Sequence, residues 1–364
     1  MSTRRLKVIL DKGISYDIRV GNRLLINIGI HLREATSATK AVIITDSNVG
    51  PRYLGKARAG LSKAGFEVFS ITIPAGEENK SISTAVELYD ELARLGIDGQ
   101  SIIIGLGGGV VCDVAGFLAS TYQSGIDYAQ VPTSLYAMVD SSIGDKKTIH
   151  LPHGRDFIGS YKRPVYAAVD LATLSTLPAN EWENGFSEIA KSALLSGPEF
   201  YQWILDNTDQ LVSHNEAAVK QAIEQTLTFK AKAVADEGLK KGSQECLDYG
   251  YAFAHALEAV FNHEISHGKA ITEGMRFAVR LGVEAAGVAD EFVEEQDRLF
   301  NSLGFQPVSG LTTIDNLYER MFSAMLLRDG ALRIVFVTKL GEWKAIEVDQ
   351  DLLKIYLILW EQES

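Results

Sequence analysis

Cysteine is scarce in this sequence of 364 residues, which contains only Cys112 and Cys246. Two thiols cannot build a disulfide framework or a cysteine-based zinc site, so a reducing cytoplasm is the expected setting. The sequence also lacks any run of about 18 apolar residues, and its first residues lack the apolar core of a signal peptide. We therefore expect a protein that is neither exported nor membrane-spanning.

Positive charge is also in short supply, because 35 Lys and Arg residues face 47 Asp and Glu residues, for a formal net charge of −12. Nucleic acids and anionic membranes bind basic surfaces, so neither is expected as a partner. A hydrophobic content of 46% and a charged content of 23% are typical of a folded globular chain. At this length we expect two domains and an acidic enzyme.

The stretch over residues 101–120, SIIIGLGGGVVCDVAGFLAS, joins an apolar run to a helical pattern through four glycines. The short β-branched run predicts a buried strand, and the spacing after Gly109 predicts a helix. The glycines permit positive φ and remove Cβ atoms that would hold a ligand away from the backbone. A helix start of this kind favours an anion such as a dinucleotide pyrophosphate. Packing alone is the alternative reason for the glycines.

Strands and helices alternate through the first half of the chain. We predict a hairpin over 6–20, a helix over 83–95, and strands at 40–44, 66–73, 101–104, 128–131 and 167–170. This alternation predicts a mostly parallel, doubly wound sheet, and thus a nucleotide-type α/β domain over 1–177.

The second half, over 178–364, is helical almost throughout. Helices are predicted over 181–195, 198–211, 216–237, 246–261, 271–286, 292–303 and 313–325. A late hairpin is predicted over 331–348.

Three residues of the first half invite a functional interpretation. Asp46 follows a predicted strand, where it could accept a hydrogen bond from a ribose hydroxyl or cap the next helix, and the pattern favours neither. Asp140 and Lys146 flank a glycine turn and could form an opposed acid and base, or simply a surface salt bridge.

In the second half, Glu188 and Lys191 lie three residues apart on one helical face. Such a pair is usually solvated. His255 lies in an apolar helix and His267 precedes a Gly-Lys pair. A lone His on an apolar face is more often a core residue than a ligand, yet one Glu with spaced His residues also suits Zn²⁺ or a similar divalent ion.

Five motifs in this order resemble the 3-dehydroquinate synthase family of sugar phosphate cyclases. They are GGGVVCDVAGF at 107–117, QVPTS at 130–134, VDSSIG at 139–144, SEIAK at 187–191 and HALE at 255–258. The resemblance covers essentially the whole chain. It implies a Rossmann-like NAD domain, a helical domain for metal and substrate, an active site between them, and a homodimer.

The resemblance also implies roles for individual residues. The positions that match NAD contacts are Asp46, Glu77, Lys80, Gly107, Gly108, Gly109, Asp113, Thr133 and Ser134. The positions that match catalytic groups are Asp140, Lys146, Lys191 and His255. The matching metal ligands, for Zn²⁺ or Co²⁺, are Glu188 and His267.

The chemistry that the resemblance implies begins with transient oxidation of one hydroxyl of a sugar phosphate by NAD. Phosphate then leaves by β-elimination, the carbonyl is reduced again, and an intramolecular aldol reaction closes a carbocycle. NAD is thereby recycled, and the metal polarises the hydroxyl as a Lewis acid.

Several positions depart from the family pattern. Tyr251 stands where the family has its first metal-binding His, and Arg155 and Asp156 stand where it has a Lys-Asn pair. Gln244 and Asp248 replace an Arg and an Asn near the substrate carboxylate. An added anion there disfavours a carboxylate and suits a hydroxyl, as in cyclases of sedoheptulose 7-phosphate or glucose 6-phosphate.

Two other functions remain open on the sequence. One is an NAD-dependent polyol dehydrogenase on a related two-domain scaffold, which would release NADH in proportion to substrate. The other is a binding or regulatory protein that kept the cofactor domain and lost catalysis, as Tyr251 would allow.

Overall fold

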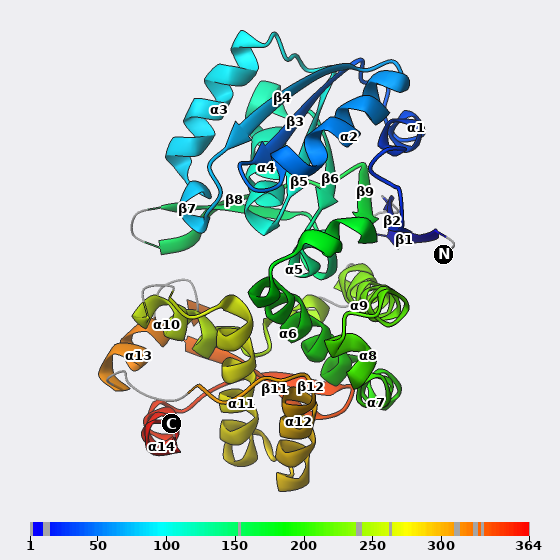
Figure 1. Cartoon of the computed structure of the whole chain (residues 1–364). Helices are drawn as coiled ribbons and strands as arrows, with labels where there is room; N and C mark the ends of the chain where they lie inside the picture. Colours follow the sequence, from blue (N-terminus) through cyan, green and yellow to red (C-terminus); the bar gives the residue numbers. More distant parts are fainter. Residues whose placement is uncertain are drawn as a thin grey trace. The chain divides into compact units, whose positions relative to one another are not determined.

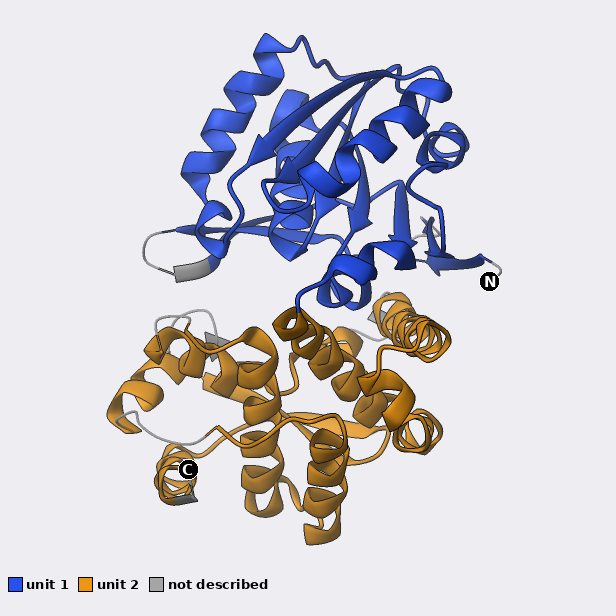
Figure 2. Cartoon of the chain, in the orientation of Figure 1, with its two compact units in different colours: residues 1–178 blue, residues 179–364 orange. Residues whose placement is uncertain are grey.

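The computed structural model describes residues 3–9, 15–151, 154–237, 242–261, 264–308, 314–322, 327–328 and 331–363. The chain divides into two compact units, Met1–Pro178 and Ala179–Ser364 (Figure 2). The sequence placed the domain boundary between residues 177 and 178. Among the residues described, no helix combines the length and apolarity needed to cross a membrane.

The first unit is built on a seven-stranded sheet in the order β1-β2-β9-β6-β5-β3-β4 (Figure 1). Its β1 and β2 pair antiparallel as the predicted hairpin, and the other neighbouring strands pair parallel. The strands are β1 (Arg4–Ile9), β2 (Ser15–Gly21), β3 (Lys40–Asp46), β4 (Glu67–Ile73), β5 (Ser101–Gly107), β6 (Asp127–Pro132) and β9 (Tyr166–Asp170). The predicted doubly wound sheet is confirmed.

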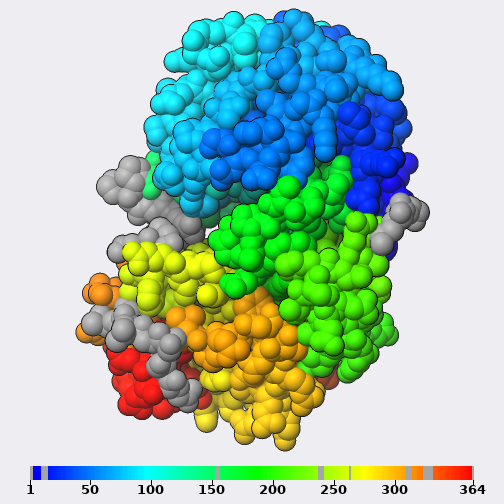
Figure 3. Space-filling model, in the orientation of Figure 1, coloured from blue at the N-terminus to red at the C-terminus, as the bar shows by residue number. Residues whose placement is uncertain are grey.

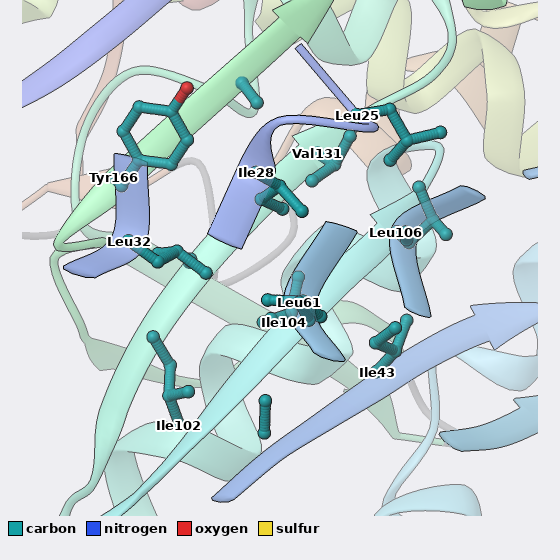
Figure 4. Close-up of a cluster of buried hydrophobic side chains, with 14 of the residues drawn as sticks. Leu25, Ile28, Leu32, Ile43, Leu61, Ile102, Ile104, Leu106, Val131 and Tyr166 are labelled. Atoms are coloured by element: carbon teal, nitrogen blue, oxygen red, sulfur yellow. The ribbon is translucent and has the colours of Figure 1, made fainter. Parts of the chain in front are cut away.

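Helices cover both faces of this sheet because its central strands are apolar on both sides. Ile102 and Ile104 of β5 belong to one buried cluster (Figure 4), and Ile103 belongs to a second cluster on the opposite face. In the space-filling view, α2 and α3 lie outermost on the visible face of this unit (Figure 3). The first cluster packs against α1 (Ile28–Arg33) and α2 (Gly50–Lys63), and the second against α3 (Ile82–Arg94) and α4 (Gly109–Thr121).

The chain reverses its direction of travel across the sheet between β3 and β5. From β3 it passes outward to β4, and from β5 it passes to β6 on the other side. The carboxyl ends of β3 and β5 lie side by side, since Thr45 pairs with Leu106. In open α/β sheets this switch point is where ligands bind.

Sequence reasoning missed a two-stranded hairpin of β7 (Lys146–Leu151) and β8 (Gly154–Tyr161), which packs on α4. The sequence pattern does not indicate these strands, because Lys147 and Thr148 occupy buried positions in place of apolar residues. Short elements were also missed, namely η2 (Glu77–Asn79), η3 (Tyr122–Ser124), α5 (Leu135–Val139) and η4 (Leu171–Thr176).

The second unit is mainly helical, as predicted, and α11 packs against α6, α10, α12 and the strand β11. Gly274 of α11 allows the close approach of the start of α10, because a Cβ on Gly274 would lie 2.1 Å from the carbonyl oxygen of Gly250. The predicted late hairpin is present as β11 and β12. The elements are α6 (Ala179–Ser196), α7 (Pro198–Asp206), α8 (Thr208–Val212), α9 (Glu216–Glu237), η5 (Ser243–Asp248), α10 (Tyr251–Val260), α11 (His267–Ala286), α12 (Asp290–Ser302), α13 (Ile314–Met321), β10 (Leu327–Arg328), β11 (Ala331–Lys339), β12 (Glu342–Glu347) and α14 (Gln350–Glu363).

Candidate active site

The glycine loop joins the end of β5 to the start of α4. Gly107 ends the strand, and Gly108 is the N-cap of the helix with φ −74°, without a side-chain cap. None of the loop's glycines at 105, 107, 108 and 109 adopts a positive φ. Of the two properties that the sequence pointed to, the permitted positive φ is thus not used at these glycines, and the missing Cβ remains.

Packing explains why residue 107 is glycine, but it does not explain Gly108 and Gly109. A Cβ on Gly107 would lie 2.6 Å from Val111, which is far too close. By contrast, a Cβ on Gly108 would meet nothing nearer than Ser134 Oγ at 3.7 Å, and one on Gly109 nothing nearer than Ser141 Oγ at 3.4 Å. Gly108 and Gly109 thus leave the uncapped start of α4 accessible to a ligand that approaches the backbone closely.

Three other predicted cofactor residues lie at the same edge of the sheet. Asp46 is buried at the end of β3, where Oδ1 accepts the backbone N–H groups of Asn48 at 2.8 Å and Val49 at 2.9 Å in the turn before α2. It is not the N-cap of that helix, which is Val49, so the capping interpretation is wrong. Thr133 follows β6 and donates its backbone N–H to the carbonyl of Gly107 at 2.9 Å. The Ser134 hydroxyl caps α5.

A cluster of five side chains, here the Lys80 cluster, comes from the residue after η2, from α4 and from the hairpin β7–β8. Its members are Lys80, Asp113, Lys147, Thr148 and Asp156. Lys80 Nζ lies 2.8 Å from Asp113 Oδ2 and 2.7 Å from Asp156 Oδ1. Lys147 Nζ is 3.7 Å from Asp113 Oδ1, and the Thr148 hydroxyl donates to Asp156 Oδ1 at 2.5 Å. The cluster therefore brings together three predicted residues and two that were not predicted.

The ion pairs of this cluster shift the pKa values of Lys80 and Asp156. Burial alone would lower the pKa of Lys80, but the carboxylates of Asp113 and Asp156 outweigh it and raise that pKa above its usual range. Burial alone would raise the pKa of Asp156, but Lys80 and the Thr148 hydrogen bond outweigh it and hold that pKa well below its usual range. Lys80 and Asp156 are therefore both charged at neutral pH.

His150 connects Glu77 to the cluster. Its Nδ1 accepts the backbone N–H of Asp156 at 3.0 Å, and its Nε2 lies 3.0 Å from Glu77 Oε1. A ring nitrogen that accepts a hydrogen bond carries no proton. The ring proton is therefore on Nε2, and this N–H donates a hydrogen bond to Glu77. Asp156 sits at φ +54°, a left-handed backbone that Asp and Asn tolerate better than most residues. His150 was not predicted, and no sequence motif marks it.

The remaining predicted residues of this unit have different surroundings. Lys146 is exposed at the start of β7, whereas the next residue, Lys147, points to the opposite side of the strand and is buried. Asp140 is half-buried at the end of α5. Arg155 lies in β8, but its side chain is outside the part of the chain that the structure describes.

The second unit contains a cluster around Glu188, here the Glu188 cluster, made of Glu188, Lys191, Lys230 and Tyr251. Glu188 Oε1 lies 2.7 Å from Lys191 Nζ, and Oε2 lies 2.8 Å from Lys230 Nζ. Lys191 Nζ also lies 3.9 Å from the centre of the Tyr251 ring, in cation–π range. The helices α6, α9 and α10 contribute these side chains.

The three charged side chains of this cluster are shielded from water. The side chains of Glu188 and Lys191 are 1% and 0% exposed, so the expectation of a solvated pair is wrong. Burial alone would raise the pKa of Glu188, but Lys191 and Lys230 outweigh it and hold that pKa well below its usual range. Lys230 was missed because it lies 42 residues from Glu188 in the sequence.

The two predicted histidines lie near Tyr251. Its ring centre is 5.1 Å from that of His255 and 6.4 Å from that of His267. Glu258 holds His267 Nδ1 at 2.9 Å, a contact that orients imidazole ligands in metal sites and leaves Nε2 to face a metal. Within the described ranges no three His, Cys, Asp or Glu side chains gather closely enough to hold an ion.

The two residues predicted near a substrate head group, Gln244 and Asp248, are exposed on η5. Asp248 adds to the effect of burial in raising the pKa of the Cys246 thiol to about 12, and thus lies close to that buried residue. Cys246 therefore stays a protonated thiol at neutral pH and is a poor nucleophile.

Two protein-family models match the chain in succession. They are 3-dehydroquinate synthase N-terminal, over residues 70–184, and 3-dehydroquinate synthase C-terminal, over residues 185–325. The 3-dehydroquinate synthase of Caulobacter vibrioides is 34% identical over 362 residues, which cover 94% of this chain and 95% of that protein. That of Desulforamulus reducens is 35% identical over 291 residues, which cover 80% and 81%.

Solved structures share the fold. A 2-deoxy-scyllo-inosose synthase complexed with carbaglucose-6-phosphate, NAD⁺ and Co²⁺ has a TM-score of 0.89 at 21% identity, over 97% of this chain and 99% of that one. A 2-epi-5-epi-valiolone synthase from Streptomyces hygroscopicus with NAD⁺ and Zn²⁺ has 0.86 at 23%, over 97% and 98%. An iron-containing alcohol dehydrogenase from Thermococcus thioreducens reaches only 0.70 at 13%, over 96% and 99%. The predicted fold class is confirmed.

Proposed function

Because this chain belongs to the 3-dehydroquinate synthase family, as its motifs suggested, we propose that it is an NAD-dependent sugar phosphate cyclase. An enzyme of this class transiently oxidises one hydroxyl of a sugar phosphate, eliminates phosphate, and closes the remaining sugar into a carbocycle. It is therefore a carbon–oxygen lyase that needs NAD only in catalytic amounts.

The first unit supplies the NAD site in this proposal. The observation that carries it is the pair Gly108 and Gly109, for which neither packing nor backbone conformation requires glycine. A pyrophosphate at the uncapped start of α4 gives both a reason. Asp46 and Thr133 border the same edge, and Lys80 with Asp113 forms the adjoining polar cluster. The chemistry that NAD supplies when bound is reversible hydride transfer.

The second unit supplies the groups that act on the substrate. Glu188 holds the ammonium of Lys191, which we assign as a hydrogen-bond donor to a substrate oxygen that gains negative charge. His255, half-buried one helical turn from Tyr251, is assigned to proton transfer. Asp140 and Lys146 of the first unit are assigned to substrate hydroxyls and phosphate.

The fold family implies a divalent ion, and the residues present fit one only in part. Glu188 and His267 are ordinary ligands for Zn²⁺ or Co²⁺, and Glu258 orients His267. Tyr251 offers a phenol where an imidazole is expected, and Lys191 covers its ring. When bound, the ion would supply Lewis-acid polarisation of a hydroxyl. We propose that Glu188 and His267 hold it weakly.

We further propose that the substrate is a sugar phosphate with an uncharged head, such as sedoheptulose 7-phosphate. Asp248, exposed on η5 with its negative charge, supports a hydroxyl partner over a carboxylate. A cytoplasmic homodimer that binds neither nucleic acid nor membrane completes the proposal, in keeping with the net charge of −12.

The test is to incubate the purified protein with NAD and a panel of sugar phosphates, and to follow phosphate release. We expect release from at least one member, and none from the Glu188→Ala variant. A polyol dehydrogenase would instead accumulate NADH in proportion to substrate. A binding protein without catalysis would show a rise in melting temperature with NAD and no phosphate release from any member.

A further inference from the structure

We propose that Asp156 makes the Lys80 cluster a hydroxyl-binding surface that rejects phosphate. The inference rests on the proposed function and deepens it, because it states which part of the ligand meets this cluster. Sugar phosphates and dinucleotides both carry charged phosphates and uncharged hydroxyls, so a site next to the glycine loop must distinguish the two.

The charges of the cluster balance. Lys80 and Lys147 contribute two cations, and Asp113 and Asp156 contribute two carboxylates. Lys80 has a carboxylate oxygen at 2.8 Å and another at 2.7 Å, so a phosphate that reached its ammonium would also meet two anions. Glu77, held through His150, adds a third carboxylate near Lys80. Repulsion between these like charges opposes phosphate binding at Lys80.

A hydroxyl group suits the same place. Within the described residues, the side-chain contacts of Asp156 with Lys80 and Thr148 all fall on Oδ1, which leaves Oδ2 as an acceptor on a side chain that is 26% exposed. An ammonium carries three N–H donors, and two of those of Lys80 are directed at carboxylates. One carboxylate oxygen and one N–H can thus accept from and donate to a sugar hydroxyl.

Asp156 is the member whose charge decides this balance, and neighbouring groups fix both its backbone and its carboxylate. Its backbone is left-handed, its N–H is bound by His150, and its carboxylate is bound by Thr148. Without its charge the five side chains would carry two cations and one carboxylate, so that even with Glu77 nearby the repulsion of phosphate would be weaker.

The test is calorimetric titration of inorganic phosphate into the full-length protein, without NAD. Asp156→Asn keeps the shape and tolerates the left-handed backbone, and Asp156→Gly removes the side chain at no backbone cost. Both variants are expected to bind phosphate at least tenfold more tightly than the unaltered chain. Asp17→Asn, which removes a half-buried carboxylate from its pair with exposed Arg5, is the matched control and should leave phosphate affinity unchanged.

A double variant locates the gain. Lys80→Gln combined with Asp156→Asn should return phosphate affinity to that of the unaltered chain, because the freed cation is lost. Phosphate affinity within twofold of the unaltered chain in both single variants, with melting temperature preserved, would overturn the proposal, as would a gain that persists without Lys80. NAD takes no part in this titration. A failure of the protein to bind NAD would therefore count against the proposed function, whereas the phosphate affinities test the role of Asp156 independently.

Discussion

The Glu188 cluster and the Lys80 cluster are centred on charged groups of opposite sign. In the first, one carboxylate lies between two lysines, and in the second, one lysine lies between two carboxylates. The two lysines of the first are buried, whereas the second is partly exposed and offers a carboxylate acceptor. In each unit the central charge is thus held by opposite charges on two sides, as a buried ion requires.

Removal of the central carboxylate should have the largest effect. Glu188→Ala leaves Lys191 and Lys230 buried without this partner, which we expect to lower the free energy of unfolding by about 3–5 kcal/mol and to abolish phosphate release. Denaturant unfolding and a phosphate assay measure the two effects. Glu183→Ala, on the same helix and paired at 4.0 Å with exposed Lys269, is the control. Equal phosphate release by Glu188→Ala and the unaltered chain would remove Glu188 from the site.

Removal of the central lysine should have a smaller effect, because water reaches its partners. Lys80→Met leaves Asp113 and Asp156 facing each other, which we expect to cost roughly 1–3 kcal/mol of stability and to weaken NAD binding about tenfold. Calorimetry with NAD and denaturant unfolding are the measurements. Lys40→Met, which breaks a pair with exposed Asp98, is the control. Unchanged NAD affinity in Lys80→Met would place the cofactor elsewhere.

Restoration of an imidazole should change metal binding and little else. Tyr251→His provides a third ligand near His267 and is expected to raise Co²⁺ affinity at least tenfold, observed as visible absorption of the bound ion and as metal content. Tyr251→Phe keeps the ring against Lys191 and is expected to leave Co²⁺ affinity as it is in the unaltered chain. Tight Co²⁺ binding by the unaltered chain would show that the site is already complete.

The smallest expected effect is on the pH dependence of stability. The pKa of Asp156 is lowered in the folded state, so its contribution is present above the unfolded value of about 3.9 and is lost as pH falls towards the folded one. The pKa of Lys80 is raised, so its contribution is lost as pH rises beyond about 10.4. Asp156→Asn should flatten the acid limb of a melting-temperature profile. An acid limb identical to that of the unaltered chain would refute the ion pair.

The same comparison shows what the sequence could predict. Glu188 and Lys191 lie on one face of one helix, so periodicity alone brought them together. The Lys80 cluster was not predictable in this way, because its members come from three elements and β7 buries Lys147 and Thr148 in place of apolar residues. Motif resemblance supplied Lys80, Asp113 and Asp156 one by one, but neither their mutual contacts nor His150, which binds through backbone groups that no motif records.

The fold itself was more accessible, since strand–helix alternation and β-branched runs such as Ile102 to Ile104 determine a parallel sheet. The backbone of the glycine loop was not. The sequence allowed either a positive φ or a missing Cβ as the reason for its glycines. The structure shows that a Cβ on Gly107 would clash with Val111, whereas one on Gly108 or Gly109 would clash with no residue described.

A limiting amount of NAD distinguishes recycling of the cofactor within each turnover from its consumption. The protein should be supplied with an accepted sugar phosphate in large excess over NAD, while released phosphate and reduced nicotinamide are measured together. We predict phosphate in many-fold excess over the NAD present, with no accumulation of NADH. Phosphate release that stops at one equivalent per NAD, or NADH that rises in step with substrate consumed, would contradict the account.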